Sequence, residues 1–423
     1  MRHWRGGWWE WRTSHWVEIE QRAMQAVAYT FTEHAAYVDE GKHKPWAPTR
    51  YKIVNLLDAL GAICHLAEDV VSPSWLDGAE YDGLLVSTAN GLLDVGRREL
   101  LAHTPLFWNA TSVPFPYDPA APAPKRWLAF LAELWPADPD SQRALQEWVG
   151  YVISGRLDLH KILLLVGPTR AGKGVTTRIL SALVGTENVA GPTLSSLNGD
   201  FGLAPLLGKT LAVVSDARLN GRGANTVVER LLSISGEDSL TVNRKYREQW
   251  TGKLPTRLMV CSNELPQLGD ASAAIAGRFV PLMLTRSWLG KEDHGLELAL
   301  REVLPGILNW ALDGLERLGA QHGFTRPPGA DEAMIALQDL SSPVAAFVRD
   351  RCVRGPEHEI SVDDLYAAWR SWAEDNGHVR STKQMFGRDL RATVPGLRVA
   401  RLGGHESSER ERVYQGVALR ESQ

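Results

Sequence analysis

The sequence predicts an α/β protein built around a parallel β-sheet. Short apolar runs, the clearest being residues 162–166 (Ile-Leu-Leu-Leu-Val), alternate with longer segments of helical periodicity. Such alternation is typical of a three-layer core, because strands buried on both faces are uniformly apolar. We expect a mainly helical domain before this core (1–150), the core itself (151–322), and a linker with a winged-helix domain after it (323–423).

The composition is that of a soluble globular protein. The chain has 423 residues, 44% hydrophobic and 23% charged, with a formal net charge of −4. Its cysteines, Cys64, Cys261 and Cys352, lack CxxC or zinc-ligand spacing, so we expect reduced thiols. No signal-peptide core and no apolar run long enough to cross a bilayer are seen, so we expect a cytoplasmic protein without membrane contact.

The N-terminal region combines aromatic and helical patterns. Tryptophans at positions 4, 8, 9, 11 and 16 predict a strand or hairpin that packs on the next domain, which we prefer to a base-stacking surface. Apolar spacing predicts helices at 21–31, 51–71 and 127–150. Asn90-Gly91 predicts a turn, and the proline-rich residues 114–124 an irregular segment.

A glycine-rich turn follows the first core strand. Residues 167–173 fit the first seven positions of G-x-x-x-x-G-K-[ST], between a strand and a helix that runs to about residue 184. The amides of such a loop hold phosphate oxygens, and its lysine reaches the β and γ phosphates. We therefore expect ATP binding by Gly167, Pro168, Thr169, Arg170, Ala171, Gly172, Lys173, Gly174, Val175 and Thr176.

The eighth position of this motif departs from the pattern. Gly174 replaces the Ser or Thr whose hydroxyl usually binds Mg²⁺. Thr176 and Thr177 carry the nearest hydroxyls, and we take Thr176 as the candidate metal ligand. Nucleotide kinases also read Gly-Lys-Gly here, which makes a small-molecule kinase a rival interpretation.

Three further strands are expected at 210–214, 257–261 and 279–284. The first ends near Asp216, which can hold Mg²⁺ beside the loop. The next residue is Ala217 and not the usual Glu, so a water-activating base must lie elsewhere. The candidates left open are Ser215, Glu229, Glu237 and Asp238.

The second strand leads to Asn263, which can sense the γ phosphate, and Arg278 follows fifteen positions later. An arginine so placed can stabilise transition-state charge in a neighbouring subunit.

The order of loop, Asp strand, Asn strand and Arg resembles the superfamily 3 helicases, and most closely the phage/plasmid primase–helicase family related to the poxvirus primase–helicase. The other stretches that resemble this family are residues 90–94, 103–105, 117–119, 146–150, 235–238, 244–246 and 262–266.

This resemblance implies an AAA+-like P-loop core that assembles as a homo-hexameric ring with ATP between subunits. It implies that Lys173 binds phosphate, Asp216 holds Mg²⁺, Asn263 is the sensor and Arg278 acts in trans. It also implies that Arg244, Lys245 and Arg247 lie on a channel hairpin that grips single-stranded DNA. Three cations beside Tyr246 independently suit phosphate neutralisation and base stacking.

The C-terminal residues predict a small DNA-binding unit. Helices expected at 344–353, 362–376 and 381–390, followed by strands at 397–401 and 412–419, suggest a winged helix. Residues 376–420 contain nine Lys/Arg against four Asp/Glu, which suits duplex DNA. The candidate contacts on the third helix are Lys383, Arg388 and Arg391.

The leading interpretation is an ATP- and Mg²⁺-dependent DNA helicase with 3′→5′ polarity, the polarity being implied by resemblance. We expect no primase domain in this chain and therefore a separate primase partner. The alternatives are a nucleotide kinase and an ATP-binding origin or regulatory DNA-binding protein whose hydrolysis is degenerate, as Ala217 suggests.

Overall fold

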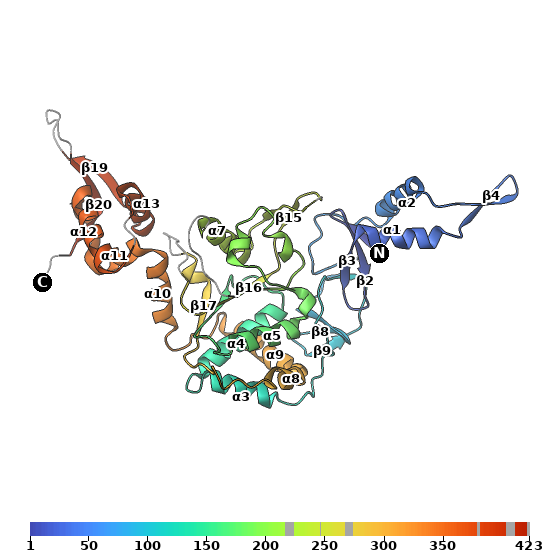
Figure 1. The fold of residues 1–423 in the computed structure, drawn as a ribbon, viewed down its shortest axis with the longest axis horizontal. Helices are drawn as coiled ribbons and strands as arrows, with labels where there is room; N and C mark the ends of the chain where they lie inside the picture. Colours follow the sequence, from blue (N-terminus) through green and yellow to red (C-terminus); the bar gives the residue numbers. More distant parts are fainter. Residues whose placement is uncertain (216–223, 246, 267–273, 379–380, 403–410, 421–423) are drawn as a thin grey trace.

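The computed structural model describes residues 1–215, 224–245, 247–266, 274–378, 381–402 and 411–420. The chain forms three parts, with the core between an N-terminal part and a C-terminal unit that project from it (Figure 1). Within the described residues, no helix is both long and apolar enough to span a membrane.

The N-terminal part is a mixture of small sheets and helices. The predicted tryptophan-rich strands are confirmed as an antiparallel sheet, and Asn90-Gly91 lies at the turn between two strands. The elements in chain order are β1 (Arg2–Trp4), β2 (Gly7–Trp11), β3 (Trp16–Ile19), α1 (Gln21–Thr32), β4 (Ala36–Asp39), β5 (Lys42–Pro45), α2 (Arg50–Ile63), β6 (Ser74–Trp75), β7 (Leu85–Thr88), β8 (Gly91–Asp94), β9 (Glu99–Leu101) and β10 (Phe107–Trp108).

The expectation of a mainly helical N-terminal domain is therefore wrong for its first part. The predicted helix at 51–71 ends at Ile63, and a β-hairpin separates α1 from α2. The helix expected at 127–150 is two helices, α3 (Lys125–Leu134) and α4 (Pro139–Ile153). Asp138 begins α4, because its carboxylate accepts the Ser141 N–H (2.9 Å) and Pro139 suits the first turn.

The core is a five-stranded parallel sheet in the order β12-β13-β16-β11-β17, as the apolar runs predicted. Alternate strand residues enter two apolar clusters: Leu163 packs with α4, α5 and α9 on one face, and Leu164 packs with α7 on the other. The strands are β11 (Ile162–Val166), β12 (Val189–Ala190), β13 (Leu211–Val214), β16 (Arg257–Ser262) and β17 (Phe279–Met283). The helices are α5 (Lys173–Val184), α6 (Leu194–Leu197), α7 (Ala224–Ser235), α8 (Leu296–Arg301) and α9 (Leu304–Gln321), with short η1 (Thr186–Asn188), η2 (Ala204–Leu206) and η3 (Ala276–Arg278).

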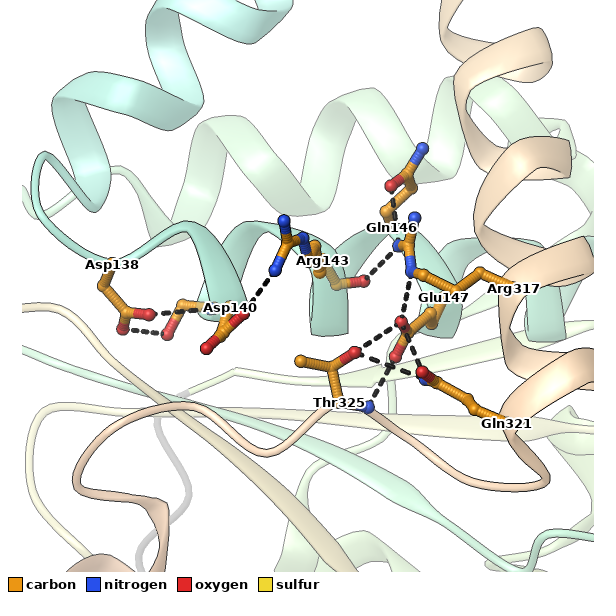
Figure 2. A network of polar contacts seen from close by, with 9 residues as sticks. Asp138, Asp140, Arg143, Gln146, Glu147, Arg317, Gln321 and Thr325 are labelled. Carbon is orange, nitrogen blue, oxygen red and sulfur yellow. Dashed lines mark hydrogen bonds and ion pairs between the residues drawn. The ribbon is translucent and has the colours of Figure 1, made fainter.

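A buried carboxylate joins the core to the chain that leaves it (Figure 2). Glu147 of α4 is 0% exposed and accepts hydrogen bonds from Arg317 Nε (2.7 Å) and Gln321 Nε2 (3.0 Å) of α9. It also accepts from the backbone N–H and the hydroxyl of Thr325, both at 2.7 Å. The start of the predicted linker is therefore held against α4, because four donors from α9 and Thr325 bind the Glu147 carboxylate.

The C-terminal unit packs three helices on a three-stranded antiparallel sheet of order β18-β20-β19. Its core holds Phe347, Trp369 and Phe386. The predicted helices and final strands are confirmed, but the sequence missed α10 and β18. The elements are α10 (Ala330–Ser341), α11 (Pro343–Arg351), β18 (Cys352–Ser361), α12 (Val362–Asp375), α13 (Lys383–Thr393), β19 (Arg398–Leu402) and β20 (Glu411–Leu419).

Candidate nucleotide and DNA site

The glycine-rich loop leaves the carboxyl end of β11 and turns into α5. A Cβ atom at Gly167 would lie 2.5 Å from the Leu284 carbonyl oxygen, so this position requires glycine. Arg170 (φ 61°) and Gly172 (φ 92°) adopt left-handed conformations. Such turns direct successive amides into a concave surface that suits an anion, next to the N-terminus of α5.

The side chains of Lys173 and Asn263 contact each other beside this loop. The Lys173 ammonium donates to Asn263 Oδ1 at 3.0 Å and to the Pro168 carbonyl at 2.9 Å. The sheet register explains the meeting, because Val166 pairs with Ser262 and both strands end at the same edge. The structure therefore brings together two residues that the sequence named separately. Ligands of open α/β sheets bind at this carboxyl edge.

A strap after β17 (residues 287–292) braces the loop from outside, and no pattern in the sequence predicted it. Ser287 Oγ donates to the Thr169 carbonyl (2.7 Å), and the Trp288 N–H donates to the Arg170 carbonyl (3.0 Å). Glu292 lies 3.5 Å from the Arg170 guanidinium. These contacts hold the loop in the conformation described above.

The candidate metal hydroxyls occupy different environments. Thr176 is fully buried, and its hydroxyl donates to the Gly172 carbonyl at 3.1 Å. Thr177 is half-buried, donates to the Lys173 carbonyl at 2.8 Å and lies 3.7 Å from Cys261 Sγ on β16. Residues three apart share a helix face, so Thr177 lies on the face of Gly174, where the usual hydroxyl is missing. Of the two, Thr177 is the better placed.

The remaining core candidates divide between the two edges of the sheet. Arg278 directly precedes β17, whose Phe279 pairs with Ile162, so this arginine lies at the edge opposite the loop. Five strand residues separate the edges, a distance of about 16 Å. Arg278 shares its edge with Lys161, whose Nζ donates to the Gly277 carbonyl (2.6 Å) and whose pKa is lowered by burial and by the charges of Arg278 and Arg326. Arg278 therefore faces away from the loop of its own chain.

The candidates for a water-activating base are not gathered at the loop. Glu237 lies at the far edge, where His160 Nε2 and Lys253 Nζ each lie 3.3 Å from its carboxylate. Glu229 is exposed on α7, and Ser215 is exposed directly after β13. The backbone N–H of Asp238 donates to the Ser233 carbonyl at 3.1 Å. Asp216, the expected metal ligand, and Ala217 lie outside the described residues.

The three cations predicted for a channel hairpin lie in the turn that joins β14 (Leu240–Val242) to β15 (Trp250–Gly252). Arg244 donates to the Glu248 carbonyl (2.9 Å), Arg247 forms an ion pair with Glu18, and Lys245 Nζ lies 5.6 Å from the Phe201 ring centre. Tyr246 is outside the described residues. The hairpin thus rests on the N-terminal sheet, a contact that the sequence did not predict.

An arginine of the N-terminal sheet completes this contact. Arg5 donates to the Thr251 carbonyl (3.0 Å), and its guanidinium lies 5.2 Å from the Trp250 ring centre. Burial lowers the pKa of Arg5, and the nearby charge of Arg244 adds to the shift.

The three cations predicted on the last helix of the C-terminal unit all lie on α13. Lys383 forms an ion pair with Asp363, and Arg388 with Asp389 at 2.8 Å. Arg391 is exposed and has no carboxylate partner in the part of the chain that the structure describes. Of the three, Arg391 is the most available to an anionic ligand.

Family models of known proteins match three stretches that together cover most of the chain. Family models match residues 3–136 (D5 N terminal like), 165–278 (a family of unknown function, DUF5906) and 341–399 (Poxvirus D5 protein-like). "Putative helicase 022R" of Frog virus 3 (isolate Goorha) is 24% identical over 298 residues, 63% of this chain. The chain spans only 30% of that relative's length.

Two solved structures share the fold. The apo structure of the NrS-1 C-terminal region (305–718) has a TM-score of 0.57 at 13% identity and covers 98% of this chain and 95% of that one. An A-form apo structure of the same region has a TM-score of 0.52 at 12% identity, with 98% and 96% covered. The family models, the viral relative and the shared fold identify the chain as a member of the D5-like primase–helicase family.

Proposed function

We propose that this chain is an ATP-dependent DNA helicase of superfamily 3 that works as a hexameric ring in phage or plasmid DNA replication. The observation that carries the proposal is the meeting of Lys173 and Asn263 at the mouth of the glycine-rich loop. An ammonium and an amide at the carboxyl edge of a parallel sheet are placed to contact the terminal phosphate of a nucleotide held there.

The nucleotide site fits ATP and Mg²⁺ through its donor set. The concave amides of residues 167–176 would hold the phosphates, while the Thr177 hydroxyl and Asp216 are the candidate metal ligands. When bound, the metal would neutralise phosphate charge. Lys173 would then exchange its contacts with loop carbonyls for phosphate oxygens.

A ring is supported by the position of Arg278. Five strand residues, about 16 Å, separate it from the loop of its own chain. It would therefore contact a nucleotide only in a neighbouring subunit. A cyclic ring joins two different surfaces of each subunit, so in the proposed ring the Arg278 edge of one chain would meet the loop edge of the next. The 3′→5′ polarity rests on family resemblance alone.

DNA contact is proposed at two places. The β14–β15 hairpin, with Arg244, Lys245 and Arg247, would hold a single strand in the channel. The C-terminal unit, in which helices pack on an antiparallel sheet, would dock on duplex DNA as a winged helix through Arg391 of α13.

The test is ATP hydrolysis by the purified protein with and without single-stranded DNA. DNA should stimulate turnover, and Lys173→Ala should reduce it by at least about 100-fold, because a charged phosphate contact is lost. Lys42→Ala, an exposed change on the β4–β5 hairpin, is the matched control. ATP binding without turnover would instead favour a regulatory DNA-binding protein.

A further inference from the structure

A cationic cleft of about 620 Å³ opens in the C-terminal unit. It lies where the end of α11, the start of β18 and the end of β20 come together. Apolar side chains and a thiol (Val348, Cys352 and Val353) and basic side chains (Arg349, Arg354, His358 and Arg420) line it.

Two of its arginines lack a carboxylate partner among the residues that the structure describes. Arg420 is fixed by the backbone, because Nε donates to the Cys352 carbonyl (3.1 Å) and Nη2 to the Arg349 carbonyl (2.9 Å). Within the described ranges, neither Arg420 nor Arg354 has a carboxylate partner. Arg349, by contrast, is paired with Asp339 and Asp350. The cleft therefore keeps two positive charges, one of them on a guanidinium already held in place.

The Cys352 thiol in this cleft is not suited to act as a nucleophile or a metal ligand. Cys352 is buried, and burial raises its pKa to about 11 although Arg354, Arg420 and Arg351 act to lower it. A protonated thiol is a poor nucleophile and a poor metal ligand. The convergence of guanidinium groups around it points to an anionic ligand.

We infer that this cleft binds phosphate groups of a nucleic-acid backbone, an inference that rests on the proposed function of the C-terminal unit in DNA docking. Guanidinium groups match phosphate geometry with paired N–H donors, and a guanidinium held in advance loses less entropy on binding. No Phe, Tyr or Trp side chain lines the cleft, so base stacking on a large aromatic ring is not its mode. Contact with backbone positions a protein on DNA without reading sequence.

This second contact is distinct from the one at α13. Arg391 lies near Tyr414 of β20, whereas Arg420 comes six residues later, just beyond the end of the same strand. At about 3.3 Å per residue, the two lie roughly 20 Å apart along the strand. DNA carries a phosphate about every 3.4 Å along each strand, so this span corresponds to about six phosphates. The cleft would extend the footprint of the unit by about half a helical turn.

The experiment measures DNA affinity of the full chain across a range of salt concentrations for wild type, Arg354→Gln and Arg370→Gln. Arg354 makes no side-chain bond to another described residue, so its substitution should leave the thermal midpoint unchanged. Arg370 is an exposed arginine on α12 and serves as the control. The probes are a duplex, a single strand of equal charge, tripolyphosphate and polyglutamate.

Arg354→Gln should weaken DNA binding about three- to tenfold, equally for different sequences, and reduce the slope of log K against log salt by about one. Arg370→Gln should change neither.

The duplex and single-strand arms decide which form of DNA supplies the backbone, and preferential tripolyphosphate binding would show a site for free phosphate instead. An unchanged slope in a folded variant, or polyglutamate competing better than DNA, would overturn the inference. If Arg354→Gln binds DNA as wild type does while DNA still stimulates hydrolysis, only the cleft assignment is wrong. If the wild-type protein neither binds DNA nor is stimulated by it, the proposed function is wrong as well.

Discussion

Lys173 Nζ lies 3.0 Å from Asn263 Oδ1, although 90 residues separate them in the chain. The contact joins the helix after β11 to the end of β16, two neighbouring strands of the sheet. Removing the amide should leave phosphate binding by the loop intact while removing a group that positions the reacting phosphate. Asn263→Ala should therefore lower kcat about 100-fold with a much smaller change in KM for ATP. Steady-state kinetics measure this, and an equal change in both constants for Asn263→Ala would contradict it.

Arg278 should act on the nucleotide of a neighbour. In mixtures of wild-type and Arg278→Ala subunits, hydrolysis should depend on the fraction of adjacent pairs that retain the arginine, because each site needs one group from each chain. ATP binding by Arg278→Ala alone should persist, since its own loop is at the opposite edge of the sheet. Mixing with Lys173→Ala should restore part of the activity. Strictly additive activities in that mixture would place Arg278 outside the site.

Glu147 should be needed for stability. Its buried carboxylate accepts four hydrogen bonds, and Glu147→Ala would remove the acceptor of Arg317 Nε and of both Thr325 donors, and one of the acceptors of Gln321 Nε2. We expect a loss of about 3 to 5 kcal/mol in the free energy of unfolding. Urea denaturation measures it, with the exposed Glu316→Ala as control. Equal stabilities of the two variants would show that the network contributes little.

The contact between Glu18 and Arg247 should compete with DNA. Glu18→Gln removes the carboxylate partner of Arg247, so single-stranded DNA should bind more tightly, by about two- to fivefold at low salt. Glu20→Gln changes an exposed acid nearby and should have no such effect. Fluorescence anisotropy with a labelled oligonucleotide measures the affinity. Weaker binding by Glu18→Gln would mean that the contact holds the hairpin in its DNA-binding position.

Cys352 should make the C-terminal unit sensitive to alkaline pH. Burial raises its pKa from 9.0 to about 11, so deprotonation favours the unfolded chain. Its contribution to stability is present below pH 9 and should be lost as the pH rises towards 11. Thermal unfolding across this range measures it, and Cys352→Ala should flatten the dependence. An identical pH profile in that variant would assign the effect to other groups.

The central sheet was predictable because its signal is local. Strands buried on both faces must be uniformly apolar, and residues 162–166 and 257–261 show this without any partner. β18 was not predictable, because its sequence contains Gly355-Pro356 and four charged residues or histidines around a bulge. Its strand conformation is stabilised by pairing with β20, a contact between residues far apart in the chain.

The sequence by itself determined the glycine-rich loop and the order of the candidate residues, because strand, turn and helix are contiguous and the motif acts through its own backbone. Only the tertiary structure decided that Asn263 joins Lys173, that Arg278 lies at the opposite edge, and that a strap ending near Glu292 braces the loop. Those relationships depend on strand order and register. Both are set by long-range packing of the two faces of the sheet, which no local pattern specifies.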